Sequence, residues 1–354
     1  MTERPGSPST QDAERPLVDA EGLTRYLDAK LPGEGPFAVE RHRAGHSNET
    51  FFIRRSGHEW ILRRPPRGAF LPTAHDVMRE HRVLRALADT QVRTPRPLVA
   101  CEDEAVIGAP FYVMERVDGI VVRERLPDWA SEGERHRIGE ELIDALAELH
   151  AVDWQAVGLE GWGRPSGYLD RQLKRWSGQL ELTMPLTRAL PDLEKVGAWL
   201  AGNKPESPAS TIVHGDYKLD NVVLASDPPA RINGILDWEM STIGDPIADL
   251  GYMLSFWREP GDDADRLLSE QLEVTGQPGF PTREELVDRY AKQTGRHVGD
   301  VTWYEVLATW KLAILLEGAY ARHLSGVTDD PFFALLQKGV PALARRALGV
   351  AETA

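Results

Sequence analysis

The residues with the clearest capacity for chemistry lie in the segment HGDYKLDN at 214–221, which has the pattern H-x-D-x-x-x-x-N. Asp237 follows Asn221 by sixteen residues and ends an apolar run typical of a strand, so we expect its carboxylate at a strand terminus. Phosphoryl transfer needs Mg²⁺ on the phosphate oxygens and a carboxylate that orients the attacking hydroxyl, and Mg²⁺ takes few protein carboxylates. Asp216 as the base, with Asn221 and Asp237 as metal ligands, meets these requirements.

Each of these residues also has a purely structural interpretation. Asp216 and Asn221 are residue types common in turns, and Asp237 is of a type that caps helices. They occur in this order, however, with a predicted β-hairpin between Asn221 and Asp237. The combination therefore favours the catalytic interpretation.

The segments around the motif indicate how it is held. Strands are predicted within 211–216, 221–226 and 231–239, with Asp227-Pro228-Pro229 as the turn between the last two. Helical periodicity dominates the rest of the chain after residue 117. The expected helices are 133–151, 167–183, 190–202, 246–257, 262–274, 282–293, 301–324 and 331–348.

The earlier part of the chain has a different character. Short β-rich segments occur between 37 and 53, at 59–64, and in two further stretches, PLVACED and PFYVMERV, the second of which ends at residue 117. The only helical pattern in this part runs from 74 to 89, with Thr73 as its N-cap. Strands and helices are thus segregated, which predicts an α+β fold. We expect a small β-rich lobe with one helix at 19–116, a large mainly helical lobe at 117–354, and a disordered tail at 1–18.

Composition excludes several classes of function. Lys and Arg number 41 against 55 Asp and Glu, and a net charge of −14 argues against a nucleic-acid partner, whose binding needs a basic surface. The single cysteine, Cys101, cannot form an internal disulfide. The polar N-terminus has no apolar segment of a secretory signal, and no run of apolar residues approaches the length of a membrane span. We therefore expect a cytoplasmic protein with no membrane partner.

Together these motifs resemble the aminoglycoside phosphotransferase and choline kinase superfamily, which has the bilobal protein-kinase-like fold. HGDYKLDN is similar to its catalytic loop, ILDWE at 235–239 lies where kinases carry D-F-G, and GDPIADLG at 244–251 matches G-D-P-x-x-D-L-G. The likeness covers about residues 35–330. The stretch from Glu59 to Leu87 further resembles the kinase-like domains that are fused to acyl-CoA dehydrogenases.

The resemblance implies a role for each residue of the catalytic loop. Asp216 matches the base, and Asn221 and Asp237 match the two Mg²⁺ ligands. Lys218 corresponds to the lysine that contacts the γ-phosphate of ATP, with a solvated loop lysine as the alternative. His214 matches a histidine that packs against the loop and takes no part in the chemistry.

The resemblance also implies nucleotide contacts in the β-rich lobe. Arg63 lies where kinases carry a strand lysine, with adjacent Arg64 as the alternative; alternation along a strand allows only one of them to face inward. Glu80 matches the helix glutamate that pairs with that cation. Backbone groups of the hinge would bind adenine, and the first hairpin loop would bind phosphate. The residues concerned are Glu115 and Val117 in the hinge and Gly45, Ser47 and Asn48 in the loop.

Asp245 and Asp249, four residues apart, have the spacing of a second carboxylate pair for a metal. Asp245 precedes Pro246, however, and an N-cap followed by proline at the first helical position explains it more simply. The resemblance implies that Asp249 braces the catalytic loop.

The expected function is a small-molecule kinase that uses ATP and Mg²⁺. Its acceptor hydroxyl would belong to a hydroxyacyl-CoA or hydroxy acid, or to an amino-alcohol or aminoglycoside. A catalytically inactive nucleotide-binding or scaffold protein is the alternative, favoured only by arginine in place of the strand lysine. A protein kinase is disfavoured because GDPIADLG begins seven residues after Asp237 and leaves no room for a peptide-docking segment.

Overall fold

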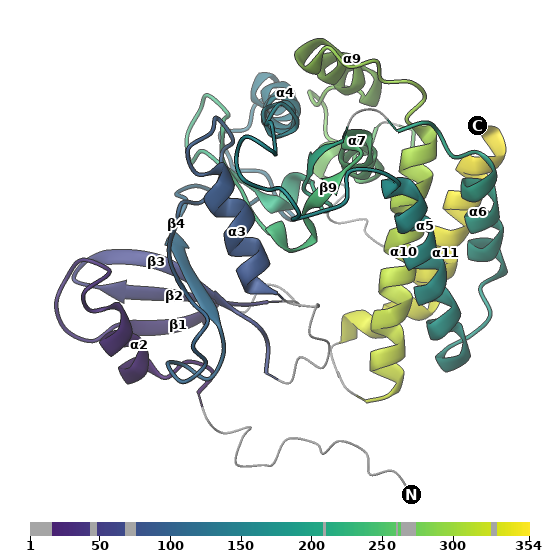
Figure 1. Ribbon diagram of the computed structural model, residues 1–354. Coiled ribbons are helices and arrows are strands. Elements are labelled where there is room, and N and C mark those ends of the chain that lie inside the picture. The colour runs from purple at the N-terminus through teal and green to yellow at the C-terminus, as the bar shows by residue number, and fades with distance from the viewer. Residues whose placement is uncertain are drawn as a thin grey trace, which may run out of the picture. The chain divides into compact units, whose positions relative to one another are not determined.

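The structure is a computed structural model, and it describes residues 16–42, 48–67, 76–207, 210–259, 261–262, 274–326 and 331–354. The chain forms two compact units (Figure 1). The N-terminal unit extends to Asp89 and also includes Thr94–Val117, whereas Thr90–Arg93 and Asp118–Ala354 form the C-terminal unit. The strand-rich and helix-rich parts expected from the sequence are both present, so the predicted α+β fold class is confirmed.

The N-terminal unit is built on an antiparallel sheet of five strands in the order β1-β2-β3-β5-β4. The bounds are Ala38–His42 for β1, Glu49–Arg55 for β2, His58–Arg64 for β3, Pro97–Cys101 for β4 and Phe111–Glu115 for β5. Ser56 and Gly57 join β2 to β3, and both have positive φ, as a tight two-residue hairpin requires. This turn sets the register in which Arg63 lies opposite Thr50.

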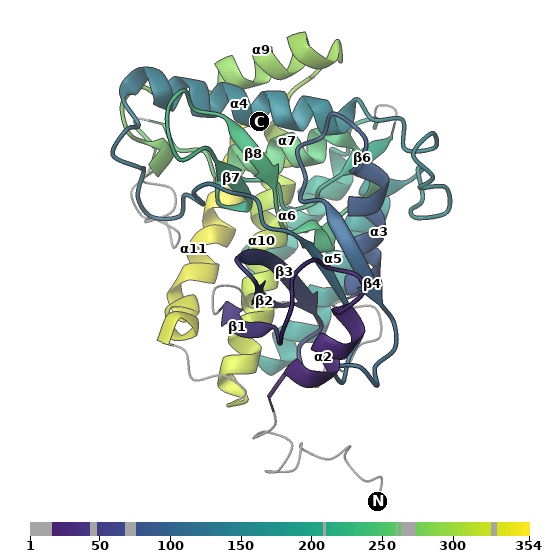
Figure 2. The same cartoon turned by 90° about the vertical axis from the view of Figure 1, so that its left-hand side faces the viewer.

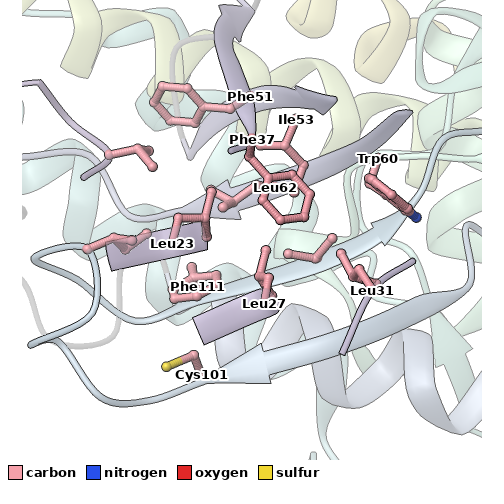
Figure 3. Packing of buried hydrophobic residues seen from close by; sticks show 13 residues of the cluster. Leu23, Leu27, Leu31, Phe37, Phe51, Ile53, Trp60, Leu62, Cys101 and Phe111 are labelled. Carbon is pink, nitrogen blue, oxygen red and sulfur yellow. The ribbon is translucent and has the colours of Figure 1, made fainter. Parts of the chain in front are cut away.

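One face of this sheet is covered by α2 (Ala20–Leu27), a helix that the sequence prediction of one helix in this part had missed. The Asp19 carboxylate caps it by accepting the N–H groups of Glu21 and Gly22. Leu23 and Leu27 are fully buried against apolar side chains of the strands (Figure 3). Eight residues are too few for a strong periodic signal, and so short a helix is stable mainly through its packing.

The helix α3 (Val77–Leu87) was predicted, but its start differs. Asp76 is the N-cap, and its carboxylate accepts the N–H of Arg79. Thr73, the expected cap, lies outside the described residues. Glu80 is in the first turn of this helix and is buried.

The C-terminal unit is mainly helical, and the helices agree with the sequence prediction within a few residues, apart from 262–274, which falls almost entirely outside the described residues. They are α4 (Glu132–His150), α5 (Tyr168–Thr183), α6 (Pro191–Gly202), α7 (Pro246–Ser255), α9 (Arg283–Thr294), α10 (Thr302–Leu324) and α11 (Pro331–Thr353). Two pairs of short strands interrupt them. β6 (Thr211–Val213) pairs with β9 (Thr242–Gly244), and β7 (Val222–Leu224) pairs with β8 (Ile232–Ile235).

The long helix α10 organises the core of this unit, because it packs against α5, α6, α7 and α11 (Figures 1 and 2). Its indole and phenol side chains, including Trp303, Tyr304 and Trp310, are buried. Within the described ranges, no helix combines the length and the apolar character that crossing a bilayer would require. The helix α10 thus packs at the centre of this unit and also contacts the segment that follows β6.

Candidate active site

The predicted catalytic loop begins directly after β6, and a buried carboxylate holds its first residues. Asp249, in the first turn of α7, accepts the backbone N–H of His214 at 2.6 Å and that of Gly215 at 2.7 Å. Gly215 has φ of 84°, and a Cβ there would lie 2.6 Å from the carbonyl oxygen of Met240. Glycine is therefore required at this position, and Asp249 braces the loop as the sequence resemblance implied.

The Asp249 carboxylate is itself supported by His150, the last residue of α4. Nε2 of His150 lies 3.3 Å from Oδ2 of Asp249, and Nδ1 lies 2.7 Å from the hydroxyl of Tyr290. A carboxylate only accepts, so Nε2 carries the proton and Nδ1 accepts from Tyr290. Burial lowers the pKa of His150, although Asp249 acts against this. Burial alone would raise the pKa of Asp249, but contacts with His150, His214 and the Gly215 N–H outweigh it and lower that pKa.

His214 connects the loop to the segment that ends in Asp237. Its Nε2 lies 2.8 Å from the carbonyl oxygen of Leu236, and its Nδ1 accepts the backbone N–H of Asp216 at 3.3 Å. The imidazole is fully buried and also contacts the ring of Trp238. These contacts agree with a packing role and leave neither ring nitrogen for a metal.

The structure brings Asp216 and Asn221 together. The Nδ2 group of Asn221 donates to Oδ2 of Asp216 at 2.7 Å and to its carbonyl oxygen at 2.8 Å. This orientation leaves the amide oxygen Oδ1 as the Asn221 atom that can bind a cation. Asp216 keeps a quarter of its side chain exposed, so its carboxylate remains accessible to a small molecule.

Asp237 lies beside Asn221 because both flank the paired strands β7 and β8. Val222 is paired with Ile235, and the N–H of Leu236 donates to the carbonyl oxygen of Asn221 at 2.8 Å. Asp237 itself adopts a left-handed backbone with φ of 64° and ψ of 62°. This conformation costs a non-glycine residue about 1 kcal/mol or more and commonly occurs where side-chain direction matters.

The donor set at this end of β7 and β8 suits Mg²⁺. A carboxylate from Asp237 and an amide oxygen from Asn221 are oxygen ligands, and Mg²⁺ typically takes one or two such ligands with water and phosphate completing its shell. Among the described residues, no group of three or more His, Cys, Asp or Glu side chains forms a site that would hold a metal by itself. Asn221 and Asp237 would thus offer Mg²⁺ two protein ligands and leave the rest of its shell to other groups.

Lys218, two residues after Asp216, lies among carboxylates. Its Nζ is 3.1 Å from Oδ2 of Asp220 and 3.9 Å from Oδ2 of Asp216, and it faces the ring of Phe256. Burial alone would lower the pKa of Lys218, but the charges of Asp216 and Asp220 raise it. The ammonium is thus a fixed positive charge next to the predicted base.

Two residues beside this loop were not identified by the sequence analysis. Tyr252 of α7 lies near Asp216; burial and the Asp216 carboxylate raise its pKa well above the ordinary value. Lys311 of α10 donates from Nζ to the carbonyl oxygen of Gly215 at 2.6 Å. A lysine inside an otherwise apolar helical stretch, WKLAILL, is the only hint that the sequence offered.

In the N-terminal unit, strand alternation separates the two candidate arginines. Arg64 shares the face of Leu62 toward α2 and donates to the carbonyl oxygens of Leu17 and Pro65. Arg63 points to the other face, where its guanidinium forms an ion pair with Glu80 of α3 at 3.1 Å. The cation and the glutamate that the sequence analysis paired are therefore in contact.

The structure says less about the remaining residues that the sequence analysis assigned to the nucleotide. The N–H of Glu115 donates to the carbonyl oxygen of Arg96 at 2.9 Å, so it is not available to adenine. Val117 is half-buried and is the last residue of the N-terminal unit. Asn48 is buried immediately before β2, whereas Gly45 and Ser47 lie outside the described residues.

Asp245 is a helix cap, as the sequence predicted. Its carboxylate accepts the N–H of Ile247 at the start of α7 and the hydroxyl groups of Ser207 and Tyr304. Burial raises its pKa, and these hydrogen bonds act against that shift. Its oxygens are occupied within the protein, so Asp245 and Asp249 do not form a second metal pair.

The strained backbone of Asp237 yields a prediction about stability. Asp237→Gly should have a free energy of unfolding about 1 kcal/mol higher than that of Asp237→Ala, because glycine adopts φ of 64° without strain. Its urea midpoint should therefore lie at the higher concentration. Both variants lack the carboxylate, so their difference isolates the backbone. Equal midpoints and slopes in urea unfolding would show that position 237 carries no strain.

The buried neutral His150 yields a prediction about pH. Its pKa is lowered in the folded chain, so the unfolded chain binds the extra proton as pH falls below about 6.5. Stability should therefore decline between pH 7.5 and 5.5, and the decline should be smaller in His150→Gln. Thermal unfolding of both proteins across that range measures the difference, and parallel curves would contradict it. His297→Gln, a change at a histidine outside this cluster, is the control.

Comparison with known proteins places this geometry in a family. Residues 38–286 match the model of the family described as "Phosphotransferase enzyme family". Acyl-CoA dehydrogenase family member 11 of Rattus norvegicus is 34% identical over 324 residues, which cover 89% of this chain and 41% of the rat protein. The chain thus corresponds to about two fifths of the length of that curated relative.

Solved structures show the same architecture. A protein of Ralstonia eutropha, provisionally named an aminoglycoside phosphotransferase, is 32% identical and has a TM-score of 0.78, with 95% of this chain and 99% of that chain covered. A spectinomycin phosphotransferase, solved in complex with ADP and spectinomycin, shares the fold at 10% identity, with a TM-score of 0.58 over 93% of this chain and 98% of that one. Because the family match includes the catalytic-loop segment, β7, β8 and Asp237, the chain belongs to the phosphotransferase enzyme family.

Proposed function

We propose that this phosphotransferase is an ATP-dependent kinase that transfers the γ-phosphoryl group to a hydroxyl of a small molecule. The observation that carries the proposal is the hydrogen-bonded set of Asp216 and Asn221 with Asp237 at the adjacent strand end. This set combines one accessible carboxylate with two oxygen ligands. ADP bound to the spectinomycin phosphotransferase supports an adenine nucleotide as the donor.

In this proposal, each of the four site residues in the C-terminal unit has one role. Asp216 orients the acceptor hydroxyl and accepts its proton as the oxygen attacks phosphorus, and the Asn221 N–H group keeps its carboxylate in place. The amide oxygen of Asn221 and the carboxylate of Asp237 would hold Mg²⁺. Bound Mg²⁺ would offset charge on the phosphate oxygens. Lys218 adds positive charge where the transferred group becomes more negative.

In the N-terminal unit, we propose that Arg63 binds phosphate oxygens of ATP and that Glu80 orients the guanidinium. Arginine can donate two parallel hydrogen bonds to phosphate, so replacing the usual lysine need not remove phosphate binding. Asn48, Gly45 and Ser47 are assigned to the same nucleotide, as are backbone groups at Glu115 and Val117. We retain a cytoplasmic location as part of the same proposal.

The alternative is a nucleotide-binding protein without catalysis. Arginine at the strand-lysine position is the observation that favours it. The intact contact between Arg63 and Glu80 weakens that argument, because the cation and its carboxylate partner are both retained. An inactive protein would also have no need for a strained aspartate at position 237.

Two classes of acceptor fit the comparisons. The relatives named acyl-CoA dehydrogenases suggest a hydroxyacyl-CoA or a hydroxy acid, and the antibiotic phosphotransferases suggest an amino-alcohol or aminoglycoside. Both are alcohols, so both are compatible with Asp216 as the base.

The test is calorimetric titration of ATP with and without Mg²⁺, followed by turnover measured as ADP release. ATP should bind more tightly with Mg²⁺, and Asp237→Ala should remove that difference. Asp216→Asn should keep Mg²⁺-dependent binding but lower turnover by about two orders of magnitude or more, because the base is lost. Full activity in Asp216→Asn would refute the assignment of the base. Failure of the wild-type chain to bind ATP would favour the scaffold alternative.

The two arginines of β3 provide a matched pair. Arg63→Met should weaken ATP affinity about tenfold or more, since a charge-assisted phosphate contact is lost. Arg64→Met should chiefly lower the melting temperature, because its guanidinium serves the backbone at Leu17 and Pro65. Calorimetry and thermal unfolding of both variants separate the effects, and the reverse ranking of affinities would exchange their roles.

A further inference from the structure

The C-terminal unit contains a cation that the proposed phosphoryl transfer does not use. Lys311 extends from α10 to the catalytic loop, and its Nζ donates to the carbonyl oxygen of Gly215. Gly215 directly precedes Asp216, and the charge of Asp216 acts on Lys311, so the ammonium lies near the base. A second group of an acceptor whose hydroxyl meets the Asp216 carboxylate could therefore contact Lys311.

The surroundings of this ammonium are aromatic. Its Nζ lies 4.7 Å from the ring centre of Tyr252 and 5.8 Å from that of Trp176 in α5. Ring faces attract a cation but leave its N–H groups without acceptors. An ammonium has three donors, and within the described part of the chain the Gly215 carbonyl is the one hydrogen-bond acceptor of Lys311.

The nearby carboxylates have other hydrogen-bond or ion-pair partners. Asp216, whose charge acts most strongly on Lys311, accepts a hydrogen bond from Asn221. Asp249 accepts the N–H groups of His214 and Gly215 and contacts His150. Asp220 pairs with Lys218. Among the described residues no carboxylate forms an ion pair with Lys311, although a lysine in such a setting is seldom left without one.

Charges of both signs act on this ammonium. Arg175 of α5 lies over the ring of Trp176, and the charges of Arg175 and Lys218 both act on Lys311. Burial lowers the pKa of Lys311 to about 8, with Asp216 and Asp249 acting against that shift. At pH 7 the amine is therefore still mostly protonated.

We propose that Lys311 determines acceptor specificity by binding a carboxylate of the acceptor, which makes hydroxycarboxylates the substrate class of the Asp216 site. The inference rests on the proposed kinase function and selects between its two classes of acceptor. A carboxylate would supply the hydrogen-bond acceptors that the ammonium lacks. An amino-alcohol or aminoglycoside bound in the same way would instead place its ammonium against that of Lys311, and like charges repel.

The experiment compares matched acceptors that differ only in charge. Hydroxycarboxylates of three to six carbons are assayed beside the corresponding diols, amino-alcohols and hydroxyacyl thioesters, with ATP and Mg²⁺ and with phosphorylated product detected directly. In the wild-type chain, kcat/KM should be about tenfold or more higher for the carboxylates than for the diols, and lowest for the amino-alcohols. A preference for diols, amino-alcohols or thioesters would overturn the inference.

Variants at position 311 assign the preference to this residue. Lys311→Met keeps the length of the side chain and removes its charge, and it should reduce the carboxylate-to-diol ratio to near one. Lys311→Arg should retain most of the ratio. Because Lys311 also contacts Gly215, absolute rates will fall in both variants, whereas the ratio responds only to recognition of the anion. Lys195→Met, at an exposed lysine of α6, is the matched control and should leave the ratio unchanged.

Binding measurements separate this inference from the proposed function. Each hydroxycarboxylate is titrated calorimetrically into the wild-type and Lys311→Met proteins, both containing ATP and Mg²⁺. Binding to the wild-type protein that Lys311→Met weakens supports the inference, and equal binding to both or to neither overturns it. If the wild-type protein shows no Mg²⁺-dependent ATP binding, the kinase function itself is refuted. If it binds ATP but its preference among acceptors does not depend on their charge, only the role of Lys311 is refuted.

Discussion

The two hydrogen bonds from the His214 and Gly215 N–H groups to the Asp249 carboxylate are the interaction on which the rest of the candidate site depends. A buried carboxylate is costly unless its oxygens are satisfied, and these N–H groups supply charge-assisted bonds. They fix the start of the loop relative to α7. Since Asp216 is the next residue, the position of the predicted base follows directly from this buried contact.

His150 and His214 extend this arrangement in two directions. His150 connects Asp249 to Tyr290, so that α4, α7 and α9 meet at one carboxylate. His214 connects the loop to Leu236 and thereby to Asp237. Both imidazoles use their two ring nitrogens in hydrogen bonds within the protein. They act as structural connectors, and the proposed acid–base role is left to the more exposed Asp216.

In the N-terminal unit, two adjacent arginines have different partners. Adjacent arginines on β3 serve different purposes because successive side chains of a strand point to opposite faces. Arg64 satisfies backbone carbonyl oxygens on the face covered by α2, and Arg63 meets Glu80 on the other face. One strand thus stabilises the unit on one side and, on the other, presents the cation that we propose for phosphate binding.

The sequence by itself determined the α+β class, most helices, the family, and the order of Asp216, Asn221 and Asp237, because these depend on local periodicity and on a contiguous motif. Only the tertiary structure decided what lies around that motif. The helix α2 is too short for a clear periodic signal, and the left-handed backbone of Asp237 arises from its surroundings. Tyr252 and Lys311 reach the loop from α7 and α10, at positions where a pattern of neighbouring residues carries no information about a distant partner. Packing of helices brings such residues together, and a linear motif cannot record it.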